Sequence, residues 1–233
     1  MLLLGIDTSG KTASAALLDT DTEVILAETS LYTQKTHSQV IMPAVKEILS
    51  QTGKEMSDLG GIAVAAGPGS YTGLRIGVAA VKAMCFALAV KCCGVSTLKA
   101  LACNNIAFHG TICSVMKARG ELVYACAYKS NGYSLEPLFD EKLMSRDELA
   151  LELAFAGGEA LLCGDGAAEF FTANPSPKLF IAPPQGRLQT AAGTCLAALS
   201  EAFIQPDQLE VSYLQKVKAE KDLEDRQNNI PKE

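Results

Sequence analysis

Gly67-Pro-Gly-Ser-Tyr-Thr-Gly-Leu-Arg-Ile-Gly77 is the stretch that decides how this 233-residue chain folds. It follows an apolar run over residues 61–66 and precedes a long apolar segment over 78–90, so the pattern predicts a strand, a glycine-rich turn and the start of a helix. Such a turn leaves backbone N–H groups free at the helix N-terminus, where they can meet an anion or the backbone of a partner. A tight turn that binds nothing explains the same residues, and the sequence leaves both interpretations open.

The helix expected over residues 72–90 is apolar nearly all round, with Arg75 and Lys82 as its only charges. A helix that is apolar on every face is buried on every face, so it belongs either in the core or at a subunit interface. Gly73 and Gly77 lie four residues apart and leave one face bare for close helix packing. A second helix, over residues 38–51, carries apolar residues at helical spacing.

Composition limits the classes of function. The chain has a net charge of −6 and 48% hydrophobic residues, which allows a substantial core but supplies no basic field to hold nucleic acid. We expect no membrane-spanning run and no signal peptide. The eight cysteines form no Cys-x-x-Cys pair, so we expect small buried hydrophobic residues in a reduced, cytoplasmic compartment rather than disulfides or a zinc site.

The order of elements predicts the architecture. A hairpin of strands followed by strand–helix alternation occurs twice, which favours an α/β fold of two similar lobes, each a mixed sheet with flanking helices. We expect an N-terminal lobe over residues 1–100, a C-terminal lobe over 101–215, and a charged, flexible tail over 216–233.

A phosphate-loop pattern, G-x-x-x-x-G-K-T, is satisfied by Gly5-Ile-Asp-Thr-Ser-Gly-Lys-Thr12. A true phosphate loop requires a helix directly after it, but only residues 13–18 precede the turn at Asp19-Thr-Asp-Thr22. The alternative is a β-hairpin turn, which in actin-like ATPases lies near the nucleotide phosphates. Asp165, in a Gly-Asp-Gly turn of the second lobe, is a weaker acidic candidate that we interpret as an ordinary turn residue. The residues expected near a phosphate are Asp7, Thr8, Ser9, Lys11, Gly67, Gly69 and Ser70.

Four motifs in this order and spacing resemble one family: Leu4-Gly-Ile-Asp-Thr-Ser9, Ala13-Ser-Ala-Ala-Leu-Leu18, Thr36-His-Ser-Gln39 and the Gly67–Gly77 signature. The family is the TsaB (YeaZ-type) subunit of the bacterial system that makes threonylcarbamoyladenosine in tRNA. The resemblance covers about the first hundred residues. The second half matches less sharply, through residues 118–124 and 164–167.

The resemblance implies two actin-like (ASKHA, ribonuclease H-like) lobes without catalysis of their own. It implies pairing with a homologous catalytic threonylcarbamoyltransferase, an ATPase subunit in the same complex, homodimers when the chain is alone, and only indirect contact with tRNA. The catalytic homologue carries a His-x-x-x-His motif; here His37 remains and Ile41 takes the second place. The family's usual Asp ahead of the second hairpin is replaced by Lys117 in this chain, which departs from the family pattern.

The family's contact surface is a pair of N-terminal helices, here about residues 38–51 and 72–90. No cofactor belongs to the chain alone, and the resemblance places ATP or ADP with Mg²⁺, if bound, at the interface with the catalytic partner. The expected contact residues are Val40, Ile41, Ala44, Val45, Ile48, Gly73, Arg75, Ile76, Gly77, Val81 and Met84. The competing class is an enzyme acting alone, either a phosphate-loop or actin-like nucleotide hydrolase or a metallopeptidase-like protein.

Overall fold

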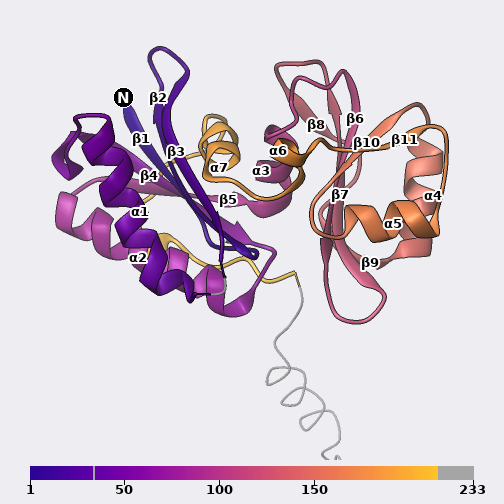
Figure 1. The fold of residues 1–233 in the computed structure, drawn as a ribbon, viewed down its shortest axis with the longest axis horizontal. Coiled ribbons are helices and arrows are strands. Elements are labelled where there is room, and N and C mark those ends of the chain that lie inside the picture. The colour runs from indigo at the N-terminus through magenta and orange to yellow at the C-terminus, as the bar shows by residue number, and fades with distance from the viewer. Residues whose placement is uncertain (34, 215–233) are drawn as a thin grey trace, which may run out of the picture.

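The computed structural model describes residues 1–33 and 35–214, and these form two α/β lobes side by side (Figure 1). The predicted fold class is therefore confirmed. The tail expected over residues 216–233 lies outside the described residues.

A five-stranded mixed sheet forms the first lobe. Its strand order is β3-β2-β1-β4-β5, with β1 antiparallel to β2 and parallel to β4. The strands are β1 (Leu2–Asp7), β2 (Thr12–Asp19), β3 (Val24–Tyr32), β4 (Leu59–Gly67) and β5 (Lys91–Ser96), with a short 3₁₀ turn η1 (Met56–Asp58) before β4. The N-terminal hairpin and the strand before the glycine-rich turn match the sequence predictions.

Helices cover both faces of this sheet, which explains why its central strands are apolar along their whole length. Side chains alternate across the sheet, so Leu4 and Ile6 pack under α1 (His37–Gln51) and α2 (Tyr71–Leu88). Leu3, one residue along, packs on the opposite face against α3 (Thr97–Cys103) and α7 (Ala191–Ala198).

The second lobe repeats the plan with a six-stranded sheet of order β11-β10-β6-β7-β8, with β9 paired to β7. Its strands are β6 (Gly110–Lys117), β7 (Leu122–Ser130), β8 (Leu135–Pro137), β9 (Lys142–Ser145), β10 (Ala160–Cys163) and β11 (Leu179–Ile181), and its helices are α4 (Arg146–Ala156), α5 (Ala167–Ala173) and α6 (Pro184–Arg187). Helices α4 and α5 cover one face around the buried Phe170. Helix α3 covers the other face through Leu98 and Leu101, so it packs on both sheets.

The last described part of the chain returns to the first lobe. The second lobe therefore does not extend to residue 215, as the sequence predicted, but ends before α7. Helix α7 packs on β1 and β2, and the segment after it, which includes η2 (Pro206–Gln208), places Leu209 in the core under α2. The second lobe is therefore inserted between α3 and α7, because the chain leaves the first lobe and later comes back. The sequence did not reveal this, since a short alanine-rich helix fits either lobe.

Helix α2 is 18 residues long with a mean hydropathy of 1.3, so by length and composition it could cross a membrane, contrary to the expectation from sequence. Its position is that of a core helix, because Leu74, Val81 and Cys85 are fully buried against the sheet.

All eight cysteines are buried and free of disulfide bonds. Burial raises the pKa of the Cys103 thiol to about 12 and that of Cys93 likewise. The prediction that the cysteines act as small buried hydrophobic residues is confirmed.

Candidate functional site

The two glycine-containing turns of the first lobe meet and bind each other. We call residues 7–9 and 67–70 the turn cluster. The backbone N–H of Ser70 donates to the carbonyl oxygen of Ser9 (2.7 Å), and the Thr8 hydroxyl donates to the carbonyl oxygen of Gly73 (2.8 Å). The Ser70 hydroxyl caps α2 by accepting from the N–H of Gly73 (3.2 Å). The turn cluster therefore ties the end of β1 to the start of α2.

Close approach explains the glycines of α2. A Cβ at Gly73 would collide with the carbonyl oxygen of Thr8, and one at Gly77 would collide with the Thr8 hydroxyl. At Gly67 the backbone has φ +137°, and a Cβ there would overlap the carbonyl oxygen of Ser212. The bare face that the sequence predicted is used inside the chain and is not available for packing against a partner.

Asp7 is fully buried at the centre of the turn cluster. Its Oδ1 accepts hydrogen bonds from the N–H (2.8 Å) and the hydroxyl (2.6 Å) of Ser9, whereas its Oδ2 has no hydrogen-bond partner. Desolvation by burial raises the pKa of Asp7 from 3.8 to about 6, against the opposing effect of the two hydrogen bonds from Ser9. A carboxylate held in this way is costly for the fold at neutral pH.

The phosphate-loop interpretation is wrong, because strand β2 begins at Thr12, where a helix would have to start. Lys11 is exposed in the hairpin turn, as the alternative interpretation predicted. Asp7, Thr8 and Ser9 are fully buried and bonded within the turn cluster, and the N–H groups of Ser70 and Gly73 are already used. These residues do not fit a phosphate site, since a nucleotide would first have to break the contact between the turns.

The predicted contact residues also need correction. Nine of the eleven are buried in the core of the first lobe and have no surface to offer a partner: Val40, Ile41, Ala44, Val45, Ile48, Gly73, Gly77, Val81 and Met84. The apolar character that predicts a contact for these residues also draws them under the sheet. Arg75 remains exposed and Ile76 is half-buried.

The surface that the two helices do present lies on their other side. Helices α1 and α2 lie next to each other over one face of the sheet (Figure 1). The exposed residues of the two helices include Gln39, Pro43 and Lys46 on α1 and Arg75, Ala79, Ala83 and Phe86 on α2, and we call these seven the α1–α2 face. Phe86 is 63% exposed, and the alanines beside it, Ala83 and Ala87, are too small to shield its ring. The α1–α2 face therefore combines one large exposed apolar side chain with small residues and charges.

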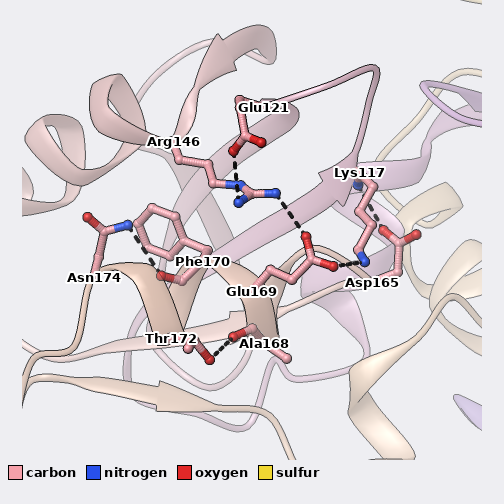
Figure 2. Close-up of polar contacts among 9 residues, drawn as sticks. All are labelled: Lys117, Glu121, Arg146, Asp165, Ala168, Glu169, Phe170, Thr172 and Asn174. Carbon is pink, nitrogen blue, oxygen red and sulfur yellow. Dashed lines mark hydrogen bonds and ion pairs between the residues drawn. The ribbon is translucent and has the colours of Figure 1, made fainter.

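The acidic turn of the second lobe is structural, as predicted (Figure 2). Oδ1 of Asp165 accepts from the backbone N–H of Lys117 (2.9 Å) and joins β6 to the turn after β10. The Lys117 ammonium pairs with Glu169, and Glu169 also binds Arg146 (2.8 Å), which in turn pairs with Glu121 (3.1 Å). The position where the family usually has an acid is thus part of a surface ion-pair network, which contributes little stability.

The histidines do not form a metal site. Nδ1 of His37 lies 3.2 Å from the carbonyl oxygen of Thr8, and Ile41 is buried one turn further along α1. Among residues 1–33 and 35–214, no three His, Cys, Asp or Glu side chains lie close enough together to hold a metal ion.

The sequence did not indicate one feature near the α1–α2 face. Tyr213, from the end of the described chain, stacks on Tyr71 at the start of α2. No periodic pattern could have placed it there, because the residues are 142 positions apart and Tyr213 lies in an irregular segment.

Two mixed α/β lobes with helices on both faces and an inserted second lobe define an actin-like protein. Solved structures agree: YeaZ from Pseudomonas aeruginosa superposes with a TM-score of 0.79 at 22% identity, covering 91% of this chain and 99% of that one. The ethanolamine utilization protein EutJ from Carboxydothermus hydrogenoformans superposes with a TM-score of 0.51 at 11% identity, covering 84% and 90%. At these identities the likeness shows the fold alone.

Sequence comparisons identify the family. Residues 26–176 match the family described as TsaD, tRNA N6-adenosine threonylcarbamoyltransferase. The tRNA threonylcarbamoyladenosine biosynthesis protein TsaB of Bacillus subtilis (strain 168) is 40% identical over 152 residues, and that of Escherichia coli (strain K12) is 35% identical over 102. The chain belongs to this threonylcarbamoyltransferase family and, within it, to the TsaB (YeaZ-type) members that its sequence signature indicated.

The matched stretches are partial. They cover 65% of this chain and 66% of the B. subtilis relative, and 44% and 43% for the E. coli relative.

Proposed function

We propose that this chain is a non-catalytic subunit in the synthesis of threonylcarbamoyladenosine in tRNA. It binds a homologous catalytic threonylcarbamoyltransferase through the α1–α2 face and stabilises that partner's active conformation. The names of the TsaB relatives, which refer to this biosynthesis, support the pathway. An ATPase subunit of the same complex and a cytoplasmic location complete the proposal.

The α1–α2 face is the observation that carries the proposal. Ala79 and Ala83 lie one turn apart on the exposed side of α2, so a partner helix can approach its backbone closely there. Phe86 extends the same line and offers a large apolar side chain to fill a pocket on the partner. The equivalent helices of a homologous subunit would present a face of similar shape, which gives a mixed contact of two helices from each chain. In the absence of the partner, two copies of this chain would pair in the same way.

The absence of catalysis in this chain is supported by Ile41. In the family's catalytic homologue the corresponding position is the second histidine of the metal motif, and here it is an apolar residue packed in the core. The net charge of −6 supports indirect contact with tRNA, because a phosphate backbone would be repelled rather than attracted.

Nucleotide, where the complex uses it, would bind at the subunit interface together with Mg²⁺. The burial of Asp7, Thr8 and Ser9 supports this assignment, since these side chains present no exposed polar group to a phosphate. Calorimetric titration of ADP and Mg²⁺ into the chain alone should give no heat of binding, and titration into the assembled complex should.

The test of the proposed function is association with the catalytic homologue from the same organism. Light scattering after size-exclusion chromatography should show a one-to-one complex that replaces homodimers of this chain. Phe86→Glu should weaken this complex about 30-fold or more, because the burial of a phenylalanine side chain contributes about 2 kcal/mol.

Phe155→Glu is the matched control. Phe155 is 93% exposed on α4 of the second lobe, so it tests the same substitution away from the α1–α2 face. Independent elution of the two wild-type chains, or equal behaviour of the two variants, would refute the proposed contact.

A further inference from the structure

The end of the described chain crosses the first lobe as an ordered strap. We use this name for residues 204–213. Its start pairs with strand β5, where Ile204 and Cys92 exchange two backbone hydrogen bonds of 2.8 and 3.0 Å. Its middle is held by Leu209, which is buried in the core. Near its end, the N–H of Ser212 donates to the carbonyl oxygen of Ala66 (2.8 Å), beside the glycine-rich turn.

The end of the strap brings a tyrosine side chain into contact with two side chains of α2. Tyr213 stacks on Tyr71 with ring centroids 5.3 Å apart and an angle of 28° between the rings. The Arg75 guanidinium lies 4.0 Å from the centroid of the Tyr71 ring, and its Nε donates to the Tyr213 hydroxyl (3.0 Å). We call Tyr71, Arg75 and Tyr213 the anchor trio.

The anchor trio is a surface feature, although its members contact one another. Tyr71 is 42% exposed, Tyr213 is 38% exposed, and Arg75 is exposed as well. Tyr71 and Arg75 stand one turn apart on α2, on the same line as the exposed Ala79. The trio therefore continues the α1–α2 face at the start of α2, whereas Phe86 lies near the opposite end.

The chemistry of the trio suits binding. Tyrosine and arginine are the residue types enriched at the energetic centres of protein interfaces. Stacking and the hydrogen bond already fix these three side chains, so little conformational entropy remains to be lost when a partner binds. The guanidinium edge away from Tyr213 can donate to a carboxylate or a carbonyl group, and the outer faces of the rings offer apolar contact.

We propose that the anchor trio is a second binding centre of the partner contact, so that the strap belongs to the interface. This inference rests on the proposed function. The occupant is the homologous catalytic subunit, presenting an acceptor group to Arg75 and an apolar or proline-containing surface to the tyrosine rings. The α1–α2 face then has bulky contacts at both ends, Tyr71 with Arg75 and Phe86, and small residues between them.

The experiment compares dissociation constants of the complex for four variants of the full chain. Tyr213→Ala and Arg75→Ala remove two members of the trio, Phe86→Glu tests the rest of the face, and Tyr133→Ala is the control. Tyr133 is 91% exposed on the second lobe and lies in a turn after β7. We expect at least a tenfold weakening for Tyr213→Ala and for Arg75→Ala, and no change for Tyr133→Ala.

Hydrogen exchange at the amide of Ser212, which donates to the carbonyl oxygen of Ala66 in β4, separates a binding role from a purely structural role of the strap. Weaker binding with this amide still protected supports the proposal. Weaker binding only in variants that lose the protection would overturn it, because the strap would then act by holding α2 in place. If Phe86→Glu weakens the complex and both trio variants bind normally, this inference fails and the proposed function stands. If Phe86→Glu also binds normally, the proposed function fails.

Discussion

Substitution of Asp7 tests whether the turn cluster holds a carboxylate at a cost to folding. The folded chain binds the Asp7 proton more tightly than the unfolded chain does, because its pKa is raised from 3.8 to about 6. This contribution makes the folded state less stable as the pH rises from about 4 to about 6, and the penalty is then constant at higher pH. The difference between the two pKa values corresponds to about 3 kcal/mol in the free energy of unfolding.

Asp7→Asn removes the titration and keeps an oxygen that can accept both hydrogen bonds from Ser9. The new amide group changes the free energy of unfolding by an amount that does not depend on pH. The test is therefore how the difference between variant and wild type changes with pH, not its absolute size. The free energy of unfolding of the variant minus that of the wild type, from urea denaturation at pH 4.5 to 7.5, should increase with pH and then level off. The increase remaining above pH 4.5 should be about 2 kcal/mol.

Asp19→Asn is a control of opposite sign. Hydrogen bonds from the N–H of Asp21 and the hydroxyl of Thr22 lower the pKa of Asp19, so its carboxylate favours the folded state as the pH rises. For this variant the same difference should decrease with rising pH only below about pH 4, so it should stay flat from pH 4.5 to 7.5 where the Asp7→Asn difference rises. A flat or decreasing difference for Asp7→Asn would refute the reasoning, since Oδ2 would then have a partner that stabilises the charge.

Three further substitutions and one labelling experiment test the fold. Val81→Glu places a charge at a fully buried position and should cost several kcal/mol, so the chain should lose cooperative urea unfolding; a well-folded variant with weakened association would contradict the core assignment. Gly73→Ala should lower the free energy of unfolding by about 1–3 kcal/mol through the collision with the Thr8 carbonyl group, and a neutral result in the same assay would show that α2 can shift. Lys11→Ala should change that free energy by less than about 0.5 kcal/mol, and neither this variant nor the wild-type chain alone should bind ADP in calorimetry, whereas binding by the wild type that Lys11→Ala abolishes would restore the nucleotide hypothesis. The eight cysteines should react with Ellman's reagent only after unfolding, and fast reaction of the native chain would show that the lobes open.

The sequence predicted where helices and strands lie better than it predicted which of their side chains are buried. The alternation in the first hairpin and the helical spacing before Gly53 are local patterns, and both gave elements close to those observed. The orientation of α2 could not be obtained in the same way. Since the helix is apolar on all sides, its pattern does not distinguish Val81, which is buried, from Phe86, which is exposed. Only the charges of Arg75 and Lys82 marked the outer side, and Ala79 follows Arg75 by one turn.

The sequence also could not predict contacts between distant parts of the chain. The strap, the return of α7 to the first lobe and the hydrogen bond from Ser70 to Ser9 depend on tertiary packing, which leaves no periodic signal in an irregular or alanine-rich segment. The sequence located the glycine-rich turn correctly but not the role of its glycines. It left a bound ligand or an empty turn as the alternatives, whereas in the structure Gly73 and Gly77 allow Thr8 to approach α2 closely.

The insertion of the second lobe also determines the order in which the protein can be completed during synthesis. Domains usually fold from the N-terminus as the chain emerges from the ribosome. Here the second lobe, which ends before α7, can finish first, while the first sheet still lacks α7 on one face and the strap on the other. A nascent chain that stops near residue 185 would expose Leu3, Leu18 and Val95, and so the lobe that begins the protein is the last to become stable.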